Sequence, residues 1–191
     1  MAERAVLSVL LCLYRTITFT DPNVGNEMGR CVGDAVSSTG NYSRQMSVFQ
    51  RTSIYLLAML SLCFRSHVEV NWFDWLLVII ATAGVGISQW AYATLGQFYT
   101  FQLGIRKDHY LITEGPYQYV MHPGYCGQFL LIMSSLLFFR TNILLTLATL
   151  VFSVYTFTWR ISSEEAMLAK EFKTNWDLYQ NVRWHMIPFI W

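Results

Sequence analysis

Charged side chains are scarce in this sequence. Asp, Glu, Lys and Arg make up 13% of its 191 residues, whereas an ordinary soluble domain carries about 25%. The formal net charge is +1, and no basic stripe follows the chain that could track a phosphate backbone. The shortage of charge leaves too little polar surface to coat a globule in water, and the charge pattern gives no indication of nucleic-acid binding.

Metal-ligand and redox motifs are also missing. The sequence has four cysteines, and none of them forms a C-x-x-C pair. No cluster of His, Cys and Asp has the spacing of metal ligands, so we expect no metal. We expect the cysteines to be small buried hydrophobes; they are Cys12, Cys31, Cys63 and Cys126.

Long apolar runs are what the sequence has in abundance, with 54% hydrophobic and 16% aromatic residues. A membrane-spanning helix needs about 20 mostly apolar residues. A weaker candidate, Ala5 to Thr20, is interrupted by Arg15; it is a first membrane helix or, alternatively, a signal sequence. The stronger candidates are Met46 to Phe64, Trp72 to Tyr99, Tyr125 to Phe139 and Thr141 to Trp159, the last continuing out of the membrane through Phe172.

These runs predict an all-α integral membrane protein, a bundle of about five transmembrane helices. Within one membrane domain, we expect residues 1–100 to supply N-terminal helices and residues 101–191 to form the functional region. Gly84 and Gly86 would permit close helix packing. The segment Asp21 to Gln45 reads as a polar loop, and Arg140 to Asn142 as a tight turn between helices.

The positions of Lys and Arg predict the orientation of the protein in the membrane. Arg106 and Lys107 lie in the segment Phe101 to Gly124, which should share one side of the membrane with the basic C-terminal tail. That side is therefore expected to be cytoplasmic. The same orientation leaves the sequon at Asn41 unglycosylated.

The segment before the fourth run is rich in turn formers and polar aromatics. Gly115-Pro116 and Pro123-Gly124 both break regular structure, and histidines and tyrosines lie between and around them. Such a segment is either a ligand clamp or an interfacial connector with anchoring tyrosines. Composition alone does not decide between these.

A second polar cluster follows the last apolar run. On a helix, Arg160 and Glu164 are four residues apart and share a face. Ionisable groups at a membrane boundary suggest function. The alternative is an ordinary ion pair where the helix leaves the bilayer.

Taken together, the clusters resemble the isoprenylcysteine carboxyl methyltransferase family. The pattern G-P-Y-x-Y-x-x-H-P-x-Y-x-G, a short helical hairpin, and then R-I-x-x-E-E-x-x-L-x-x-x-F match in both motifs and in spacing. The similarity covers about Gln102 to Ile190. The first half of the chain is similar only as generic membrane helices.

The resemblance implies an S-adenosylmethionine-dependent enzyme that methylates the carboxylate of a C-terminal prenylcysteine. Its expected partners are a prenylated CaaX-type protein or prenylcysteine and membrane lipid, and a cytosol-facing cofactor pocket would be formed by the C-terminal half. The arginine that faces the substrate, expected to be catalytic, falls on Arg160. The cofactor contacts fall on Gln102, His109, Tyr110, Leu111, Ile112, Tyr117, His122, Pro123, Gly124, Tyr125 and Glu164.

The residue types suit this chemistry. A carboxylate nucleophile is already ionised at neutral pH, so alignment and exclusion of water matter more than a general base. Arg160 can hold a carboxylate by charge-assisted hydrogen bonds. Glu164 can accept from the cofactor's ammonium or ribose hydroxyls, and aromatic rings can flank its sulfonium.

Some positions depart from the family pattern. Met121 stands where the family usually has arginine, Lys173 to Asn175 replaces a glycine-bearing turn, and Arg183 to His185 lacks the usual Val-Pro. These differences bear on the substrate more than on the cofactor, and a small lipid or isoprenoid acid is an alternative substrate.

Three alternatives remain open. A phospholipid N-methyltransferase would use the same scaffold on an amine. A sterol reductase-like protein would use NADPH, and a non-catalytic membrane scaffold would need no cofactor. In a eukaryote, we expect the protein in the endoplasmic reticulum with its C-terminus and active site cytoplasmic.

Overall fold

The computed structural model describes residues 2–18, 52, 69–99, 109–140 and 142–186. Within these ranges the regular elements are all helical, which confirms the all-α prediction for this part of the chain. The α-helices are α1 (Ala2–Thr18), α3 (Trp72–Leu95), α4 (Pro123–Phe139), α5 (Ile143–Phe172) and α6 (Thr174–Gln180), with 3-10 helices η2 (Gly96–Phe98) and η3 (Gly115–Gln118).

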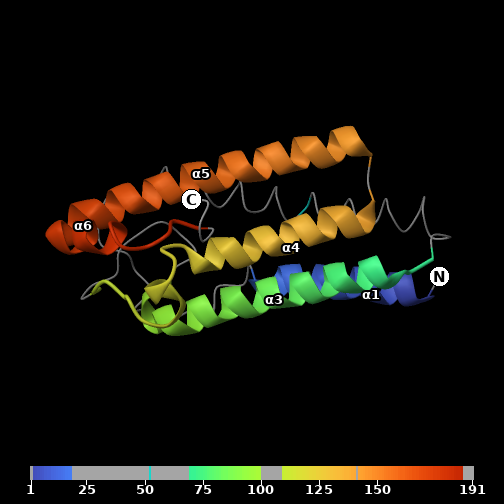
Figure 1. Ribbon diagram of the computed structural model, residues 1–191, viewed down its shortest axis with the longest axis horizontal. Coiled ribbons are helices and arrows are strands. Elements are labelled where there is room, and N and C mark those ends of the chain that lie inside the picture. Colours follow the sequence, from blue (N-terminus) through green and yellow to red (C-terminus); the bar gives the residue numbers. More distant parts are fainter. Residues whose placement is uncertain (1, 19–51, 53–68, 100–108, 141, 187–191) are drawn as a thin grey trace.

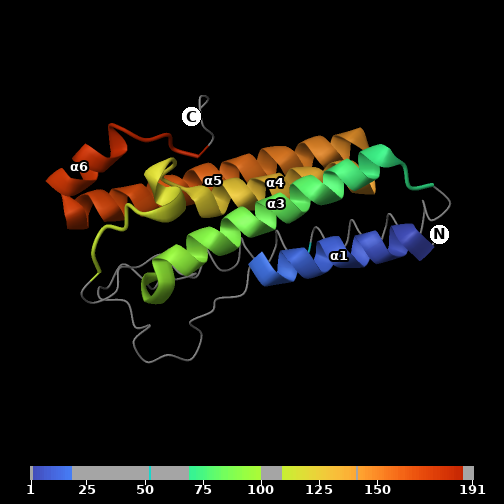
Figure 2. The ribbon, with the colours of Figure 1, turned by 60° about the horizontal axis from the view of Figure 1, so that its bottom comes forward.

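The long helices lie side by side along the long axis of the molecule (Figure 1). Helix α4 lies between α3 and α5 and runs in the opposite direction to both, while α1 lies along α3 (Figure 2). The segment 109–122 and α6 therefore meet at one end of the bundle. This arrangement brings together the polar motifs on either side of the α4–α5 hairpin.

Helix α3 begins at a capping box. The side chain of Asn71 accepts from the backbone N–H of Asp74, and the Asp74 side chain accepts from the N–H of Asn71. The helix ends where Gly96 adopts a positive φ of 52°, a conformation open to glycine without strain. These boundaries agree with the predicted run from Trp72 to Tyr99.

Helices α3 and α4 make a very close contact through small residues. A Cβ added to Gly84 would lie 2.6 Å from the carbonyl oxygen of Gly127, and the Ser88 hydroxyl donates to the carbonyl of Gly124 at 3.1 Å. The predicted packing role is confirmed for Gly84. It is wrong for Gly86, because that residue is exposed and a Cβ there would meet nothing within 4 Å.

An ion pair joins the same two helices at the end of the bundle away from α6. Arg140 ends α4 in the left-handed conformation, with φ 48°, and its Nη2 lies 2.9 Å from both carboxylate oxygens of the fully buried Asp74. Arg4 of α1 donates to the carbonyl of Phe138 nearby, at 3.0 Å. Helix α4 ends at Phe139 and α5 begins at Ile143, which agrees with the predicted short connection, and the Asn142 side chain caps the start of α5.

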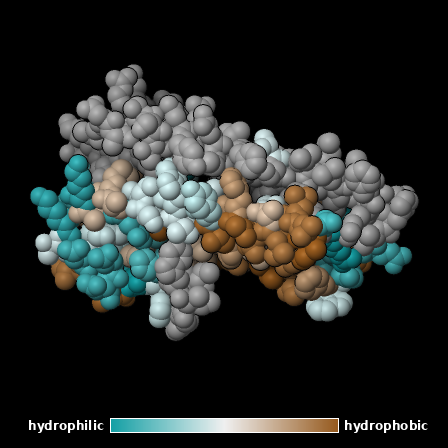
Figure 3. Space-filling model, turned by 90° about the horizontal axis from the view of Figure 1, so that it is seen from above, coloured by the Kyte–Doolittle hydropathy of each residue, from teal (hydrophilic) through white to brown (hydrophobic). Residues whose placement is uncertain are grey.

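Helices α3 and α5 are long and apolar enough to cross a membrane. The 30 residues of α5 correspond to about 45 Å, which exceeds the roughly 30 Å hydrocarbon core. The predicted continuation of the helix through Phe172 is confirmed, and its exit from the membrane after Trp159 stays a prediction. Hydrophobic residues form a broad patch in Figure 3, and hydrophilic residues gather towards the end that carries α6.

The first predicted segment is helical but begins earlier, since α1 covers Ala2–Thr18 rather than Ala5 to Thr20. Helix α4 also begins earlier than predicted, at Pro123, because proline suits the first turn of a helix. Helix α6 was not predicted. The segment Met46 to Phe64, the loop Asp21 to Gln45 and the sequon at Asn41 lie outside the described residues apart from Thr52, so the count of about five membrane helices stays a prediction.

Candidate functional site

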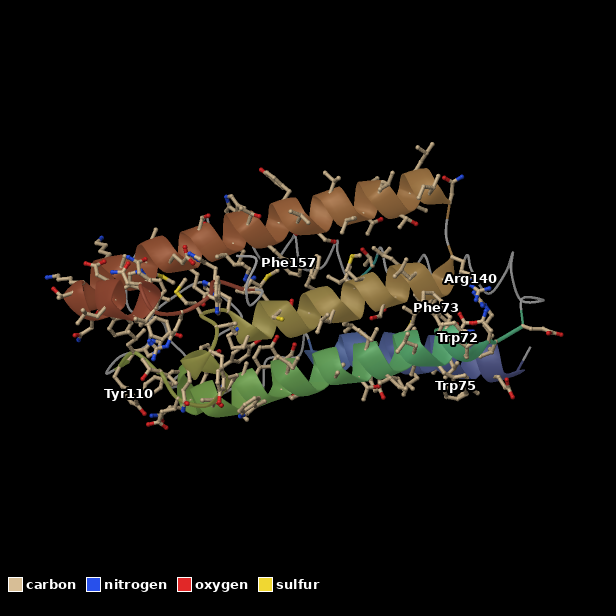
Figure 4. The ribbon with its side chains drawn as sticks, viewed as in Figure 1. Trp72, Phe73, Trp75, Tyr110, Arg140 and Phe157 are labelled. Carbon is tan, nitrogen blue, oxygen red and sulfur yellow. The ribbon has the colours of Figure 1, made fainter. Side chains whose placement is uncertain are left out.

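The polar end of the bundle gathers most of the residues that the sequence singled out. Segment 109–122, the start of α4, the second half of α5 and the segment 181–186 meet there. Figure 4 shows Tyr110 at this end, with Trp72 and Arg140 at the opposite one. The candidate site and the Asp74–Arg140 ion pair therefore lie at opposite ends of the bundle.

The start of α4 sets the position of His122 and Tyr125. His122 is the N-cap residue and is buried, and Pro123 occupies the first turn with no N–H to satisfy. Tyr125 follows one turn later, its ring 5.7 Å from that of His122. Gly124 is packed against the Tyr92 ring, where a Cβ would lie 3.0 Å from a ring carbon. Pro123 and Gly124 thus shape the backbone of the site.

Tyr125 links the two charged residues of α5. Arg160 Nε donates to the Tyr125 hydroxyl at 2.6 Å, and that hydroxyl donates to Glu164 Oε2 at 2.8 Å. Arg160 and Glu164 are four residues apart and face the same way, as predicted. They do not form a direct ion pair in the structure; the phenol lies between them. We call these three side chains the Arg–Tyr–Glu chain.

An apolar side chain of α5 borders the Arg–Tyr–Glu chain. Phe157 lies one turn before Arg160 on α5, and its ring centroid is 5.8 Å from that of Tyr125. Figure 4 shows Phe157 between α5 and α4. It is buried, as is Ile161. The charged groups thus meet buried hydrophobic side chains towards the middle of α5.

Glu165 forms a second polar group beside the first. Its Oε1 lies 3.0 Å from His122 Nε2 and 3.0 Å from His185 Nδ1. We call this group the histidine bridge. It connects α5 to the start of α4 and to the segment after α6.

Tyr117 lies at the base of the site. Its carbonyl accepts from the Tyr179 hydroxyl at 3.0 Å and from Arg183 Nε at 3.1 Å. Burial raises the pKa of the Tyr117 phenol well above its usual range, and the nearby Glu164 adds to that rise. The phenol therefore stays protonated and faces the same region as Glu164.

His109 and Tyr110 belong to an aromatic group around Phe98. The His109 ring stacks on Phe98 at 4.7 Å between centroids and meets Phe172 edge-on at 5.6 Å. Tyr110 is exposed and meets Phe98 edge-on at 5.1 Å. Phe172 lies two turns beyond Glu164 on α5, so this group flanks the site on its outer side.

The remaining predicted contacts are placed as follows. Leu111 packs with Leu168 and Phe172 around buried Met121, and Ile112 is half-buried. Gln102 lies outside the described residues. Met121 is 4% exposed and packs against Trp176 and Tyr179, so it does not lie on the membrane surface.

Sequence reasoning missed Glu165 and His185 as site residues. Glu165 belongs to the Glu164-Glu165 pair of the motif, and adjacent acidic residues on a helix point about 100° apart, which is a signal that each has its own partner. His185 carries no comparable signal, because its partner is 20 residues away and the connection depends on how α6 turns the chain back.

The chemistry of these side chains suits a cofactor with an adenine, an ammonium and a sulfonium. Glu164 is a carboxylate acceptor held by Tyr125, and the rings of Tyr117, Tyr125 and His122 offer π faces. The match to such a cofactor is one of side-chain chemistry. Within the described ranges, no group of three or more His, Cys, Asp or Glu is placed to hold a metal ion.

The chain is similar to known membrane methyltransferases in sequence and in fold. The model of the isoprenylcysteine carboxyl methyltransferase family matches residues 75–170. The protein-S-isoprenylcysteine O-methyltransferase of Schizosaccharomyces pombe is 34% identical over 87 residues, which are 44% of this chain and 35% of that protein. The chain thus matches about a third of the length of this curated relative.

A solved structure has the same fold. It is described as the eukaryotic intramembrane Ras methyltransferase, isoprenylcysteine carboxyl methyltransferase, without a monobody. The superposition has a TM-score of 0.60 and 24% sequence identity, and it covers 81% of this chain and 55% of the solved one. The family model begins inside α3 and ends near the end of α5, so it spans the Arg–Tyr–Glu chain and the histidine bridge except for His185.

Proposed function

Because the chain belongs to the isoprenylcysteine carboxyl methyltransferase family, we propose that it transfers a methyl group from S-adenosylmethionine to the C-terminal carboxylate of a prenylated cysteine. The substrate is a prenylated CaaX-type protein or prenylcysteine. The observation that carries the proposal is the Arg–Tyr–Glu chain, which places an arginine and a carboxylate on either side of one phenol, next to the apolar Phe157.

Arg160 is the group that binds the substrate carboxylate. Its Nε donates to Tyr125, and the planar fork of donors on a guanidinium matches the two oxygens of a carboxylate. This contact between Arg160 and the substrate orients the carboxylate, and it compensates for the hydration that the carboxylate loses when water is excluded. A guanidinium would repel the ammonium form of an amine, so the arginine favours an acid substrate over a phospholipid amine.

Glu164 is the group that binds the cofactor, with the rings of Tyr117, Tyr125 and His122 around it. S-adenosylmethionine, when bound, supplies an electrophilic methyl group: the carboxylate oxygen bonds to the methyl carbon and the carbon–sulfur bond breaks. No proton moves in this step, so the chain needs to orient and dehydrate the reactants rather than to act as a general base. His109, Tyr110, Leu111 and Ile112 are proposed as further cofactor contacts on the outer side of the site, and Gln102, which lies outside the described residues, is proposed as another.

The prenyl chain reaches the site from the bilayer. Two features support this path: Phe157 borders the site, and Leu147, Val151 and Val154 of the same helix are exposed apolar residues. The polar end of the bundle, with residues 101–191 as its functional region, faces the cytoplasm. In a eukaryotic cell the membrane is that of the endoplasmic reticulum.

The test is methyl transfer by the full-length protein in detergent or membranes. Radiolabelled S-adenosylmethionine is supplied with N-acetyl-farnesylcysteine, and base-labile label on the product identifies a carboxyl methyl ester. The matched control substrate is the amide of the same compound, which lacks the carboxylate. Label on phosphatidylethanolamine instead would replace this proposal with lipid N-methylation, and absence of both transfer and cofactor binding would remove the methyltransferase proposal.

A further inference from the structure

The histidine bridge has a defined direction of hydrogen bonding. An ionised carboxylate only accepts, so His122 Nε2 and His185 Nδ1 both donate to the same oxygen of Glu165, each at 3.0 Å. This requirement fixes the tautomer of each ring when the ring is neutral. It also fixes the orientation of His122, which is 4% exposed and precedes the first turn of α4.

The backbone on either side of the turn into α4 is also hydrogen-bonded to the segment after α6. His122 N–H donates to the carbonyl of His185 at 2.9 Å, and Met121 N–H donates to that of Trp184 at 2.8 Å. Val120 and Trp184 form an isolated parallel bridge. The segment 184–186 therefore completes the backbone hydrogen bonding of the turn that leads into α4, and its register is set by a side-chain contact to a third element, α5.

We propose that His185 is a positioning residue, and this rests on the proposed function. Through Glu165 it holds the segment 184–186 between α5 and the turn at Met121 and His122, and so holds His122 and Tyr125 in the arrangement that binds the cofactor. The groups that face Glu165 are His122, the N-cap of α4, and His185 from the segment after α6. The neighbouring Glu164 is directed to Tyr125 instead.

Asparagine is a conservative replacement for His185. The side-chain amide nitrogen of asparagine occupies nearly the same place as Nδ1 of histidine and is also a donor. His185→Asn should therefore keep the contact to Glu165, whereas His185→Ala removes it. Val182→Ala is the matched control, because Val182 precedes the same segment and is 73% exposed.

The first measurement is hydrogen exchange of the full-length protein, read in peptides that contain Met121 and His122. We expect His185→Ala to speed exchange of these amides by about 10-fold or more, with His185→Asn and Val182→Ala close to wild type. This readout needs no activity. Unchanged exchange in His185→Ala would overturn the proposal.

The second measurement separates KM from kcat in the methyl-transfer assay. A positioning role predicts that His185→Ala raises KM for S-adenosylmethionine about 10-fold with kcat within about threefold, and that asparagine restores it. An unchanged KM in His185→Ala, or no restoration by asparagine, would overturn the link to the cofactor. A wild-type protein without methyl transfer would count against the proposed function alone, and hydrogen exchange would then decide the role of His185.

Discussion

Gly84 of α3 and Gly127 of α4 approach so closely that a side chain on either residue would overlap the backbone of the other. Helix association in lipid depends on such close packing, since there is little hydrophobic driving force between helices in a bilayer. This contact fixes α4 against α3 and so fixes the starting point of the helix that carries Tyr125.

Replacement of Gly84 by alanine should therefore destabilise the protein by about 2 kcal/mol, because the neighbouring atom is a backbone oxygen that has little room to move. For a chain of this size that corresponds to a fall in Tm of about 4–8 °C. Gly86→Ala is the matched control on the same helix and should be neutral or slightly stabilising. Thermal unfolding in detergent checks both, and equal effects of the two variants would show that the close contact has no energetic role.

Substitution of the two charged residues in the Arg–Tyr–Glu chain should cause different defects, one in cofactor binding and one in turnover. Glu164→Ala should weaken S-adenosylmethionine binding by about 10- to 100-fold, as expected for loss of a charged hydrogen bond. Arg160→Ala should leave cofactor affinity within about threefold of wild type and lower kcat by about 100-fold. Calorimetric binding and the methyl-transfer assay separate these effects, with Ser162→Ala, an exposed position between them, as the control. Full cofactor affinity in Glu164→Ala would place the cofactor elsewhere.

The Asp74–Arg140 ion pair should stabilise the bundle without affecting the site. Removal of one partner of a buried pair costs about 3–5 kcal/mol, and we expect about 3 kcal/mol for Asp74→Asn because the Arg140 side chain is 29% exposed. Glu69→Gln, an exposed position just before α3, is the control. The readouts are Tm and cofactor affinity. A large loss of cofactor affinity in a folded Asp74→Asn protein would show that the two ends of the bundle are coupled.

Met121 should not tolerate a charge. Arginine there would place a guanidinium between Trp176 and Tyr179 in a buried position. We expect Met121→Arg to lower stability by at least about 2 kcal/mol and Met121→Leu to change it by less than about 1.5 kcal/mol. Thermal unfolding is the measurement, and a stable Met121→Arg protein would mean that the arginine reaches water along the neighbouring aromatic rings.

Ionisation of the buried Tyr179 should lower the stability of the protein at alkaline pH. Burial raises the pKa of its phenol from 10.0 to about 12, partly offset by Arg183. Since the folded-state pKa is the higher one, this contribution is complete below pH 10 and is lost as the pH rises through about 12. Tyr179→Phe should show lower Tm at neutral pH, because the hydrogen bond to Tyr117 is lost, and a shallower decline between these pH values. Parallel declines in both proteins would mean that Tyr179 does not ionise in this range.

The sequence predicted the elements that depend on local pattern. Apolar runs indicated α3 and α5 because a membrane span needs a fixed length of apolar residues, and the spacing of Arg160 and Glu164 placed both on one face. Helix α6 was not predicted, because it begins after Lys173, which adopts a positive φ of 46° that is uncommon for a residue other than glycine. A polar seven-residue helix also has too little periodicity to identify.

The two motifs identified Tyr125, Arg160 and Glu164, and the structure brings these side chains together. Their roles in binding stay predictions. The phenol between Arg160 and Glu164 was not foreseen, since the i,i+4 spacing alone suggests a direct ion pair. The contact of Glu165 with His185 depends on the path of the chain after α6, which no local pattern encodes.

The hydrogen bonds from Met121 and His122 to the carbonyls of Trp184 and His185 have a consequence for biosynthesis. The ribosome makes the chain from its N-terminus, so α3, α4 and α5 are synthesised and can insert before residues 184–186 exist. The turn into α4 must wait for its partner carbonyls until translation has passed His185. A chain terminated after α5 would therefore lack the acceptors for the N–H groups of Met121 and His122, and the turn that carries His122 would stay incomplete.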